Sequence, residues 1–275
     1  MRPGNYKRFD DKLPEEFSRP EINPYVAAHR EFGEEVLAAT DGKAWRGRWH
    51  ELFGREAPLH LEVGSGNGFY LSGMAELHPE ADWVGIEIRF KRVVLVGKKL
   101  RVAGLHNARI IRFDARAIDQ LFLPGSLAGV HVNHPDPWER ESKRHHRLID
   151  RAFLTLVTGL CAPGAEFRLR TDFGPHVKAL LTAAEGLPWE VVGTTTDVDA
   201  TGPLWPDDVV TNYQRKARER GAPVHAALLR RLASSGTIHT SAPPAPAPQP
   251  DPHTAPGPTA GPVGSEPSTH SSTLT

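Results

Sequence analysis

The sequence predicts an α/β fold in which a mostly parallel sheet carries helices on both faces. From about residue 59, short apolar runs alternate with segments of helical periodicity, the usual pattern of parallel strands joined by helices. The first apolar run also leads directly into a glycine-rich turn. With 275 residues, the chain is near the upper size for one hydrophobic core. We therefore expect a single α/β domain with additions.

Six strands are expected from the apolar runs. They cover residues 59–63, 83–87, 109–113, 129–132, 166–170 and 190–192. Helices should fill the gaps, and residues 90–103 show the clearest helical spacing. One face of this segment carries Phe90, Val93, Val94, Gly97 and Leu100, because residues three and four apart lie together on a helix. That face should pack against the sheet.

Three regions are expected along the chain. Residues 1–55 form an N-terminal extension with aromatic anchors at Trp45, Trp49 and Phe53, and residues 56–235 form the α/β domain. Residues 236–275 are dense in proline and contain almost no large apolar side chain. Such a segment buries too little apolar surface to fold, so we predict a disordered C-terminal tail.

Charge and composition restrict the function. The 33 basic and 33 acidic residues balance, but basic residues outnumber acids between positions 89 and 147, which makes a polyanionic partner plausible. The single cysteine, Cys161, excludes an intrachain disulfide and a thiolate zinc cluster. No HExxH spacing occurs, and we expect no metal. No segment has the length of a signal peptide or a membrane span, so a cytoplasmic protein without membrane contact is expected.

Acids and glycines gather where the first three strands end. Glu62 precedes a turn that contains Gly64 and Gly66, and Glu87 ends the second strand. Phe69 stands where a dinucleotide fingerprint requires glycine or alanine, which disfavours a nicotinamide or flavin dinucleotide. A carboxylate can instead accept two hydrogen bonds from a ribose diol.

Asp114 follows the third strand and completes a pattern that resembles the cofactor site of class I S-adenosylmethionine-dependent methyltransferases. The resemblance implies that Glu62, Gly64, Gly66, Glu87 and Asp114 bind the cofactor, with Glu87 on the ribose and Asp114 near the adenine. A strand-end acid can also simply cap the next helix, and this alternative remains open for Asp114.

Residues 133–148, NHPDPWERESKRHHRL, place an acid-proline corner before a basic run. The two prolines restrict the backbone on both sides of Asp136, and Trp138 offers a face for base stacking. The basic run supplies side chains that can hold phosphates: Arg140, Lys143, Arg144 and Arg147. The alternative interpretation is a surface turn followed by a solvated helix start.

With these residues in place, the chain resembles the tRNA (guanine-N7)-methyltransferases over about residues 45–229. The matching segments are LEVGSG at 61–66, GIE at 85–87, DA at 114–115, PDPW at 135–138, KRHH at 143–146, RL at 147–148, TD at 171–172 and TNYQRKARERG at 211–221. The resemblance implies a Rossmann-like class I methyltransferase fold with a mostly parallel seven-stranded sheet. It also implies S-adenosylmethionine as cofactor and tRNA as partner, with a monomer or weak homodimer expected.

The implied activity is methylation of N7 of a guanine in the tRNA variable loop, forming 7-methylguanosine. Asp136 is then the catalytic residue and also lines the cofactor side. The residues implied to meet the substrate, with those of the basic run, are Arg140, Lys143, Arg144, Arg147, Asp172, Thr211 and Gln214. Guanine N7 has a lone pair and no proton, so positioning and electrostatics should dominate catalysis. Asp136 or Asp172 could accept hydrogen bonds from the guanine N1 and N2 protons.

Several features depart from the family pattern. Arg140 stands where the family usually has lysine, and the KRHH segment is displaced by two residues from its usual distance to Trp138. Asn133 and His134 stand where the family usually has aromatic residues, and Gln214 stands where it has glutamate. Thr211 and Gln214 also satisfy a helix capping box, which offers a purely structural role.

Two alternative functions are retained. An Asn-Pro-Pro-aromatic corner is used by enzymes that methylate exocyclic amines, so Asn133 raises the possibility of an adenine or cytosine in RNA or DNA as substrate. Gln214 and the displaced KRHH segment raise a second alternative, a non-catalytic RNA-binding protein that keeps the methyltransferase fold.

Overall fold

The computed structural model describes residues 25, 31–207 and 209–233. The chain divides into two units, Met1–Ser235 and Gly236–Thr275. The predicted disordered tail, residues 236–275, lies outside the described residues, as do residues 1–24 and 26–30 of the predicted extension.

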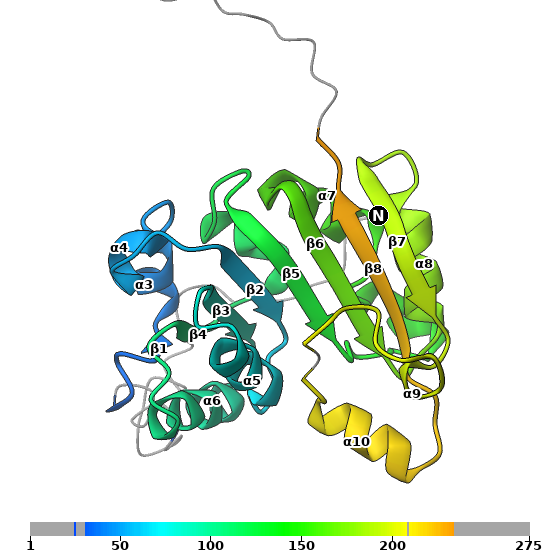
Figure 1. Cartoon of the computed structure of the whole chain (residues 1–275), viewed down its shortest axis with the longest axis horizontal. Coiled ribbons are helices and arrows are strands. Elements are labelled where there is room, and N and C mark those ends of the chain that lie inside the picture. Colours follow the sequence, from blue (N-terminus) through cyan, green and yellow to red (C-terminus); the bar gives the residue numbers. More distant parts are fainter. Residues whose placement is uncertain (1–24, 26–30, 208, 234–275) are drawn as a thin grey trace, which may run out of the picture. The chain divides into compact units, whose positions relative to one another are not determined.

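The described part of the chain forms an eight-stranded sheet in the order β1-β4-β3-β2-β5-β6-β8-β7 (Figure 1). The strands are β1 (Val36–Leu37), β2 (Leu59–Val63), β3 (Asp82–Glu87), β4 (Ala108–Arg112), β5 (Leu127–Asn133), β6 (Cys161–Thr171), β7 (Trp189–Thr195) and β8 (His225–Arg231). β8 runs antiparallel to both its neighbours, and the other pairings are parallel. The predicted α/β fold with a mostly parallel sheet is confirmed.

Helices lie on both faces of the sheet. They are α3 (Ala39–Ala44), α4 (Trp49–Phe53), α5 (Phe69–Leu77), α6 (Phe90–Val102), η1 (Ala115–Gln120), η2 (Glu141–His146), α7 (Arg151–Leu160), α8 (Pro175–Ala184), α9 (Val198–Thr201) and α10 (Asn212–Glu219). Buried side chains of α4, α7 and α8 join one large core cluster. Those of α5 and α6 form a second cluster, and those of α9 and α10 a third.

Side-chain alternation along the strands assigns these clusters to opposite faces. On β2, Leu59, Leu61 and Val63 enter the large cluster, so His60 and Glu62 point the other way. On β8, Ala227 and Leu229 enter the large cluster, whereas Ala226 and Leu228 enter the third. Helix α6 buries Val93, Val94, Val96, Gly97 and Leu100, which agrees with the face predicted from its spacing except that Phe90 is only partly covered.

The sheet has eight strands, one more than the seven that the resemblance implies, because the two-residue strand β1 pairs with β4. All six strands expected from the apolar runs form, but β1 and β8 were absent from that set. β8 reads HAALLRR, and alanine and leucine favour helix over strand when considered locally. Its pairing with β6 and β7, which are distant in sequence from one another, determines its conformation.

A polar cluster interrupts the core on the face between α5 and α10. His60 Nδ1 lies 3.2 Å from His131 Nε2, and the Tyr70 hydroxyl lies 2.9 Å from His131 Nδ1. Burial lowers the pKa of His60 to about 4 and that of His131 well below its ordinary value. These rings are therefore neutral in the folded protein and join β2, β5 and α5 through hydrogen bonds.

No helix among the described residues has the length and apolar character required to cross a bilayer. Within the same residues, no group of three or more His, Cys, Asp or Glu side chains could hold a metal ion.

Candidate active site

A pocket of about 340 Å³ opens at the carboxyl ends of β2, β3 and β5 and beside the residues that follow β4. This is where open α/β sheets bind ligands. The predicted site residues that line it are Glu62, Gly64, Gly66, Glu87, Asp114, Asp136 and Thr211. The structure places the others outside its lining: Arg140, Lys143, Arg144, Arg147, Asp172 and Gln214.

One part of the lining, here called the cofactor wall, consists of Glu62, residues 64–67, Glu87 and Asp114. Gly64 and Gly66 adopt φ values of +77° and +54°, which L side chains rarely adopt. Close packing also requires Gly85 in β3, since a Cβ there would lie 2.4 Å from Ser65 Oγ. These glycines bring the turn against β3 and leave its backbone open to the pocket.

Glu87 is held by the backbone around it. Its Oε1 accepts hydrogen bonds from the N–H groups of Ile88 and Arg89 at 2.8 and 3.0 Å, and its Oε2 accepts one from Gly66 at 3.0 Å. Asp114 Oδ1 accepts a hydrogen bond from the Arg116 N–H at 2.9 Å, so Asp114 caps η1 while it also lines the pocket. Both carboxylates are therefore fixed in orientation.

Glu62 is almost completely buried at the base of this wall. Burial raises its pKa to about 7, and the nearby Glu87 charge also raises it. Asn133 Nδ2 donates to Glu62 Oε1 at 3.4 Å, whereas Oε2 has no hydrogen-bond partner. A buried carboxylate with an unpaired oxygen is suited to a ligand that brings a positive charge.

These residues fit S-adenosylmethionine, which carries an ammonium, a sulfonium, a ribose diol and an adenine. Glu62 offers an unpaired carboxylate oxygen for a cation, and Glu87 offers acceptors at the end of the next strand. The opened glycine turn gives a ligand close access to the backbone.

A second part of the lining, here called the corner wall, consists of residues 133–136, Trp138 and residues 211–213 at the start of α10. Asp172 and the rest of α10 lie outside the lining and support it. His134 and Trp138 have positive φ values of 47° and 40°, which are strained for bulky residues. Arg147 holds the corner in place, because its Nε donates to the Pro137 carbonyl at 2.7 Å and its Nη2 to the Trp138 carbonyl at 3.3 Å. Asp136 is exposed within the pocket lining.

Asp172 lies behind this corner. Its Oδ1 is 3.3 Å from His134 Nδ1, and its Oδ2 accepts from Arg220 Nη2 at 3.4 Å. The hydrogen bond with His134 holds the pKa of Asp172 below its usual value. The His134 ring stacks on Tyr213, with ring centres 5.7 Å apart. Of the two candidate acids, only Asp136 reaches the pocket lining.

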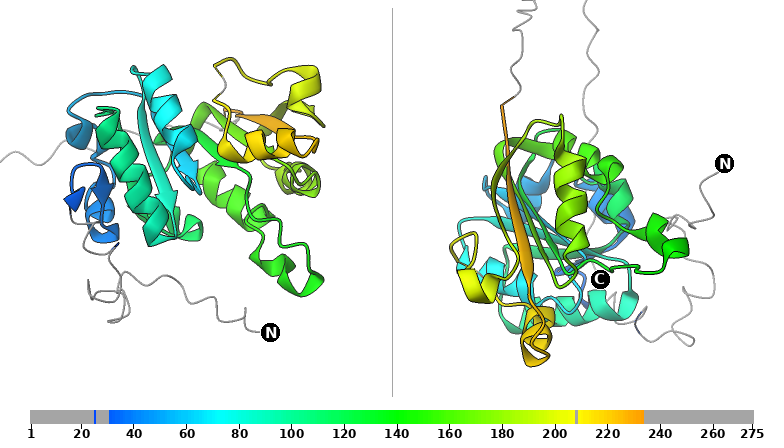
Figure 2. Two further views of the ribbon diagram at one scale, coloured as in Figure 1. Left: turned by 90° about the horizontal axis from the view of Figure 1, so that it is seen from below. Right: turned by 90° about the vertical axis from the view of Figure 1, so that its right-hand side faces the viewer.

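The basic run divides into two structural groups. Arg140, Lys143 and Arg144 are exposed on and beside η2, in a segment that projects from the body of the domain (Figure 2). Arg144 also pairs with Glu141 at 2.8 Å. Arg147 instead uses its guanidinium on the corner carbonyls, so its position indicates a structural role.

The capping box predicted at α10 forms only in part. Thr211 Oγ1 accepts from the Gln214 N–H at 3.0 Å, but the Gln214 side chain does not return to the cap. It is 1% exposed, and its Oε1 accepts from Arg170 Nη1 at 2.7 Å. A buried arginine requires an acceptor, and this demand directs Gln214 inward rather than toward a substrate.

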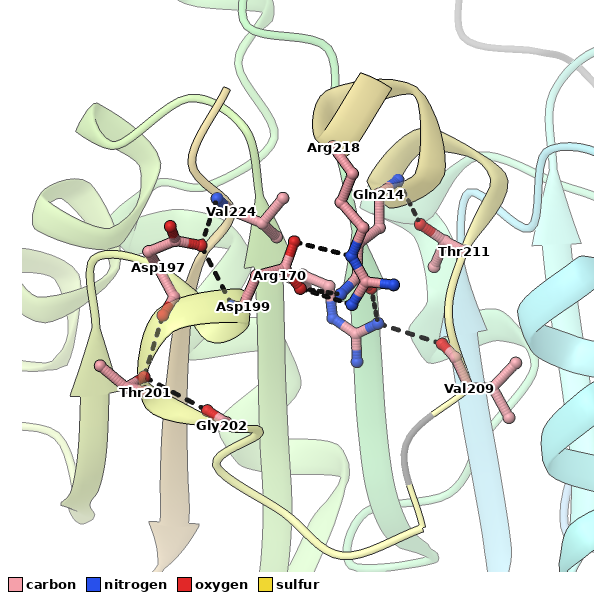
Figure 3. A network of polar contacts seen from close by, with 10 residues as sticks. All are labelled: Arg170, Asp197, Asp199, Thr201, Gly202, Val209, Thr211, Gln214, Arg218 and Val224. Atoms are coloured by element: carbon pink, nitrogen blue, oxygen red, sulfur yellow. Dashed lines mark hydrogen bonds and ion pairs between the residues drawn. The ribbon is translucent and has the colours of Figure 1, made fainter. Parts of the chain in front are cut away.

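Figure 3 shows the polar network around Arg170. The guanidinium, on β6, donates to the Val209 carbonyl at 3.0 Å as well as to Gln214. Gln214 Nε2 donates to Asp199 Oδ1 at 3.4 Å, and Arg218 Nε donates to Asp199 Oδ2 at 2.7 Å. The network thus fastens the start of α10 to the sheet and to α9.

Sequence reasoning missed His134 and Arg170 as residues that shape the site, whereas Tyr213, which lines the pocket, belongs to the segment 211–214 that the resemblance assigns to the substrate. His134 was noted only as a departure from the family pattern, and no local pattern marks Arg170. Arg170 stands in the segment EFRLRT, residues 166–171, where apolar and basic residues alternate. This alternation predicts that Arg168 and Arg170 share the polar face of a strand, so only the fold reveals that Arg170 is buried.

Comparisons with known proteins show which chains this one resembles. The family model described as "Putative methyltransferase" matches residues 56–227. The tRNA (guanine-N(7)-)-methyltransferase of Geobacillus kaustophilus is 29% identical over 204 residues, which is 74% of this chain and 91% of the relative. The enzyme of the same name from Cutibacterium acnes is 35% identical over 187 residues, 67% of each chain.

Among solved structures, 16S rRNA methyltransferase KamB has a TM-score of 0.53 at 17% identity and covers 68% of this chain and 94% of its own. This likeness shows the shared fold. On the family match and the identities above, the chain belongs to the tRNA (guanine-N(7)-)-methyltransferase family.

Proposed function

We propose that this protein transfers a methyl group from S-adenosylmethionine to N7 of a guanine in tRNA, in the variable loop, and forms 7-methylguanosine. The observation that carries the proposal is the pocket itself. Glu62 and Glu87 line one wall, and Asp136 of the acid-proline corner lines the other. The relatives named tRNA (guanine-N(7)-)-methyltransferase support the choice of base and RNA.

The cofactor wall would hold S-adenosylmethionine through the residues predicted from the sequence. Glu62 would face its positive charge, Glu87 its ribose hydroxyls and Asp114 its adenine, while Gly64 and Gly66 allow close approach. The bound cofactor supplies the electrophilic methyl group. Asp136, which lines the pocket beside this wall, is assigned to both cofactor and base.

On the substrate side, Asp136 would accept hydrogen bonds from the guanine N1 and N2 protons. This interaction offsets the positive charge that develops on the base as N7 is methylated. No side chain is required to remove a proton, so the residues act by positioning. Asp172 orients His134 beneath the corner, and Thr211 begins α10 at the pocket edge.

The exposed basic residues Arg140, Lys143 and Arg144 would hold tRNA phosphates. Arg147 and Gln214 are assigned to positioning because their side chains bond within the protein. We assign catalysis to residues 56–235, with residues 1–55 as an extension and 236–275 as a tail. A cytoplasmic location and a monomer or weak homodimer complete the proposal.

The alternatives make different predictions. The relatives named above favour guanine N7 over an exocyclic amine. Incubation of the purified protein with labelled S-adenosylmethionine and unmodified bulk tRNA, followed by nucleoside analysis, distinguishes them. We expect 7-methylguanosine; methylated adenosine or cytidine would support the amine alternative, and cofactor binding without product would support a non-catalytic protein.

A further inference from the structure

Two cationic side chains that do not line the pocket lie against one exposed aromatic ring that does. Phe69, the first residue of α5, is 38% exposed and lines the pocket. Lys99 Nζ lies 3.6 Å from the ring centre, and Arg215 Cζ lies 5.1 Å from it. Lys99 belongs to α6 and Arg215 to α10. Three helices that are separated in sequence thus meet at this ring.

Neither cation of this cluster is neutralised within the described part of the chain. No described carboxylate forms an ion pair with Lys99 or Arg215, and Arg215 Nη2 donates only to the neutral Asn212 Oδ1, at 3.3 Å. Burial lowers the pKa of Lys99, and the Arg215 charge lowers it further. By contrast, Arg218 on the same helix is paired with Asp199.

Two like charges that lie close together repel each other, and an anion bound between them would relieve this repulsion. The positions of the side chains indicate where such an anion would bind. Phe69 lines the pocket, but Lys99 and Arg215 do not, so the two cations flank its outer rim. A ligand that spans the pocket and the surrounding surface would contact both.

We propose that Lys99 and Arg215, held over Phe69, bind a phosphate of the tRNA backbone next to the base that enters the pocket. The inference rests on the proposed function, since it takes tRNA as the substrate. This site would give the tRNA backbone a second region of contact, formed by α6 and α10, in addition to the basic residues on and beside η2. Arginine and lysine are the usual phosphate ligands, and the exposed ring offers a surface for a neighbouring base.

The test uses the full chain and measures tRNA affinity as a function of salt concentration. Lys99→Gln and Arg215→Gln should each weaken binding several-fold and reduce the slope of log affinity against log salt by about 0.7–0.9, the value for one lost phosphate contact. Lys98→Gln and Lys216→Gln remove the same charge from exposed neighbouring positions on the same two helices. These control variants should leave the slope close to that of the parent protein.

Further measurements separate the possible sources of the anion. S-adenosylhomocysteine affinity should be unchanged in Lys99→Gln and Arg215→Gln, and Lys99→Arg should keep the parental slope and confirm that charge is the cause. If Lys99→Gln and Arg215→Gln showed the same salt dependence of tRNA affinity as the control variants, the proposal would be overturned. Weaker cofactor binding with an unchanged tRNA slope would also overturn it and would assign the two cations to the cofactor carboxylate.

The proposed function is tested separately by the nucleoside that the parent protein forms. If the parent yields 7-methylguanosine while the variants keep its salt slope, only the phosphate subsite is wrong. If the parent protein yields no methylated nucleoside but the two variants show the reduced salt dependence of tRNA affinity, the phosphate contact is supported and the methyltransferase activity is not.

Discussion

The two walls of the pocket are held by different kinds of contact. On the cofactor wall, Glu87 bonds to N–H groups one, two and 21 residues away in the chain. On the corner wall, His134 meets Asp172 across 38 residues, and Arg170 meets Gln214 across 44. Hydrogen bonds from backbone N–H groups to Glu87 survive changes of the neighbouring side chains. The contacts that support the corner wall include pairs of side chains distant in sequence, and a single substitution removes such a pair.

Single substitutions should therefore act differently on the two walls. A change in the cofactor wall should alter charge and ligand binding while the turn keeps its shape. A change in the contacts behind the corner wall should move α10 or the acid-proline corner and affect several residues together.

Asp136→Asn should cause the greatest loss of activity, because it removes the only carboxylate that the corner segment, residues 133–138, places in the pocket lining. We expect kcat to fall by about 10²–10³-fold, the range for loss of one preorganised electrostatic contact, with tRNA affinity little changed. Single-turnover methylation and filter binding measure the two quantities. Glu139→Gln, an exposed neighbour outside the lining, is the control, and normal methylation by Asp136→Asn would refute the assignment.

Arg170→Met should destabilise the corner wall by about 2–3 kcal/mol, because it removes charge-assisted bonds to Gln214 and the Val209 carbonyl from a buried site. Urea denaturation measures this loss, and hydrogen exchange should show that α10 opens first. Arg230→Met removes a partly exposed arginine that pairs with Glu166 at 3.7 Å, and should cost less than about 1 kcal/mol. Equal losses in the free energy of unfolding for Arg170→Met and Arg230→Met would show that the corner wall does not depend on the buried Arg170 contacts.

Glu62→Gln should change the pH dependence of stability in the protein without cofactor. Burial raises the pKa of Glu62 from 4.5 to about 7, so the folded state binds the proton more tightly than the unfolded state. Stability is therefore lost as pH rises from about 4.5 through 7. Above pH 7 the variant should be more stable than the parent by about 1–3 kcal/mol.

Melting temperatures from pH 4 to pH 8 measure this effect, with the exposed Glu76→Gln on α5 as the matched control. Glu62→Gln should also weaken cofactor binding, since a neutral side chain attracts a cation less strongly. A constant difference between Glu62→Gln and the parent across the whole pH range would show that Glu62 does not titrate as described.

Gln214→Glu should have the smallest effect. The new carboxylate keeps an acceptor for Arg170, and although it approaches Asp199, Arg218 already neutralises that acid. We expect activity to remain intact or rise, with a stability change below about 1 kcal/mol. Methylation rate and urea denaturation measure both, and Gln214→Met, which leaves Arg170 without this acceptor, should be more harmful. A large loss of activity in a stably folded Gln214→Glu would place this residue on the substrate.

Much of the fold was predictable because local patterns are strong there. The apolar runs of β2 to β7 and the glycine turn after β2 lie in short segments that fold in the same way in many contexts. β8 was not predictable from its own residues, because Ala226 to Leu229 become a strand only through pairing with β6 and β7. β1 has two residues, too few for any periodic pattern.

The candidate site shows the same division. Glu62, Glu87 and Asp114 were expected at one pocket because strand-end positions fix them near one another, and all three line it. The sequence alone did not distinguish an exposed from an internally bonded side chain at Asp172, Arg147 or Gln214. Each of these bonds to a group that lies on another element or loop.

Local residue patterns are enough to predict where six of the strands lie along the chain, the glycine turn and the acids at the strand ends, because backbone geometry and apolar periodicity are local properties. The order of the strands in the sheet and three side-chain contacts emerge only in the folded chain: Asp172 supports His134, Arg147 holds the corner and Gln214 pairs with Arg170. The fold also brings Lys99 and Arg215 to one ring. The physical reason is that a polar side chain bonds to whichever partner the fold places within reach, and that partner can lie anywhere in the chain.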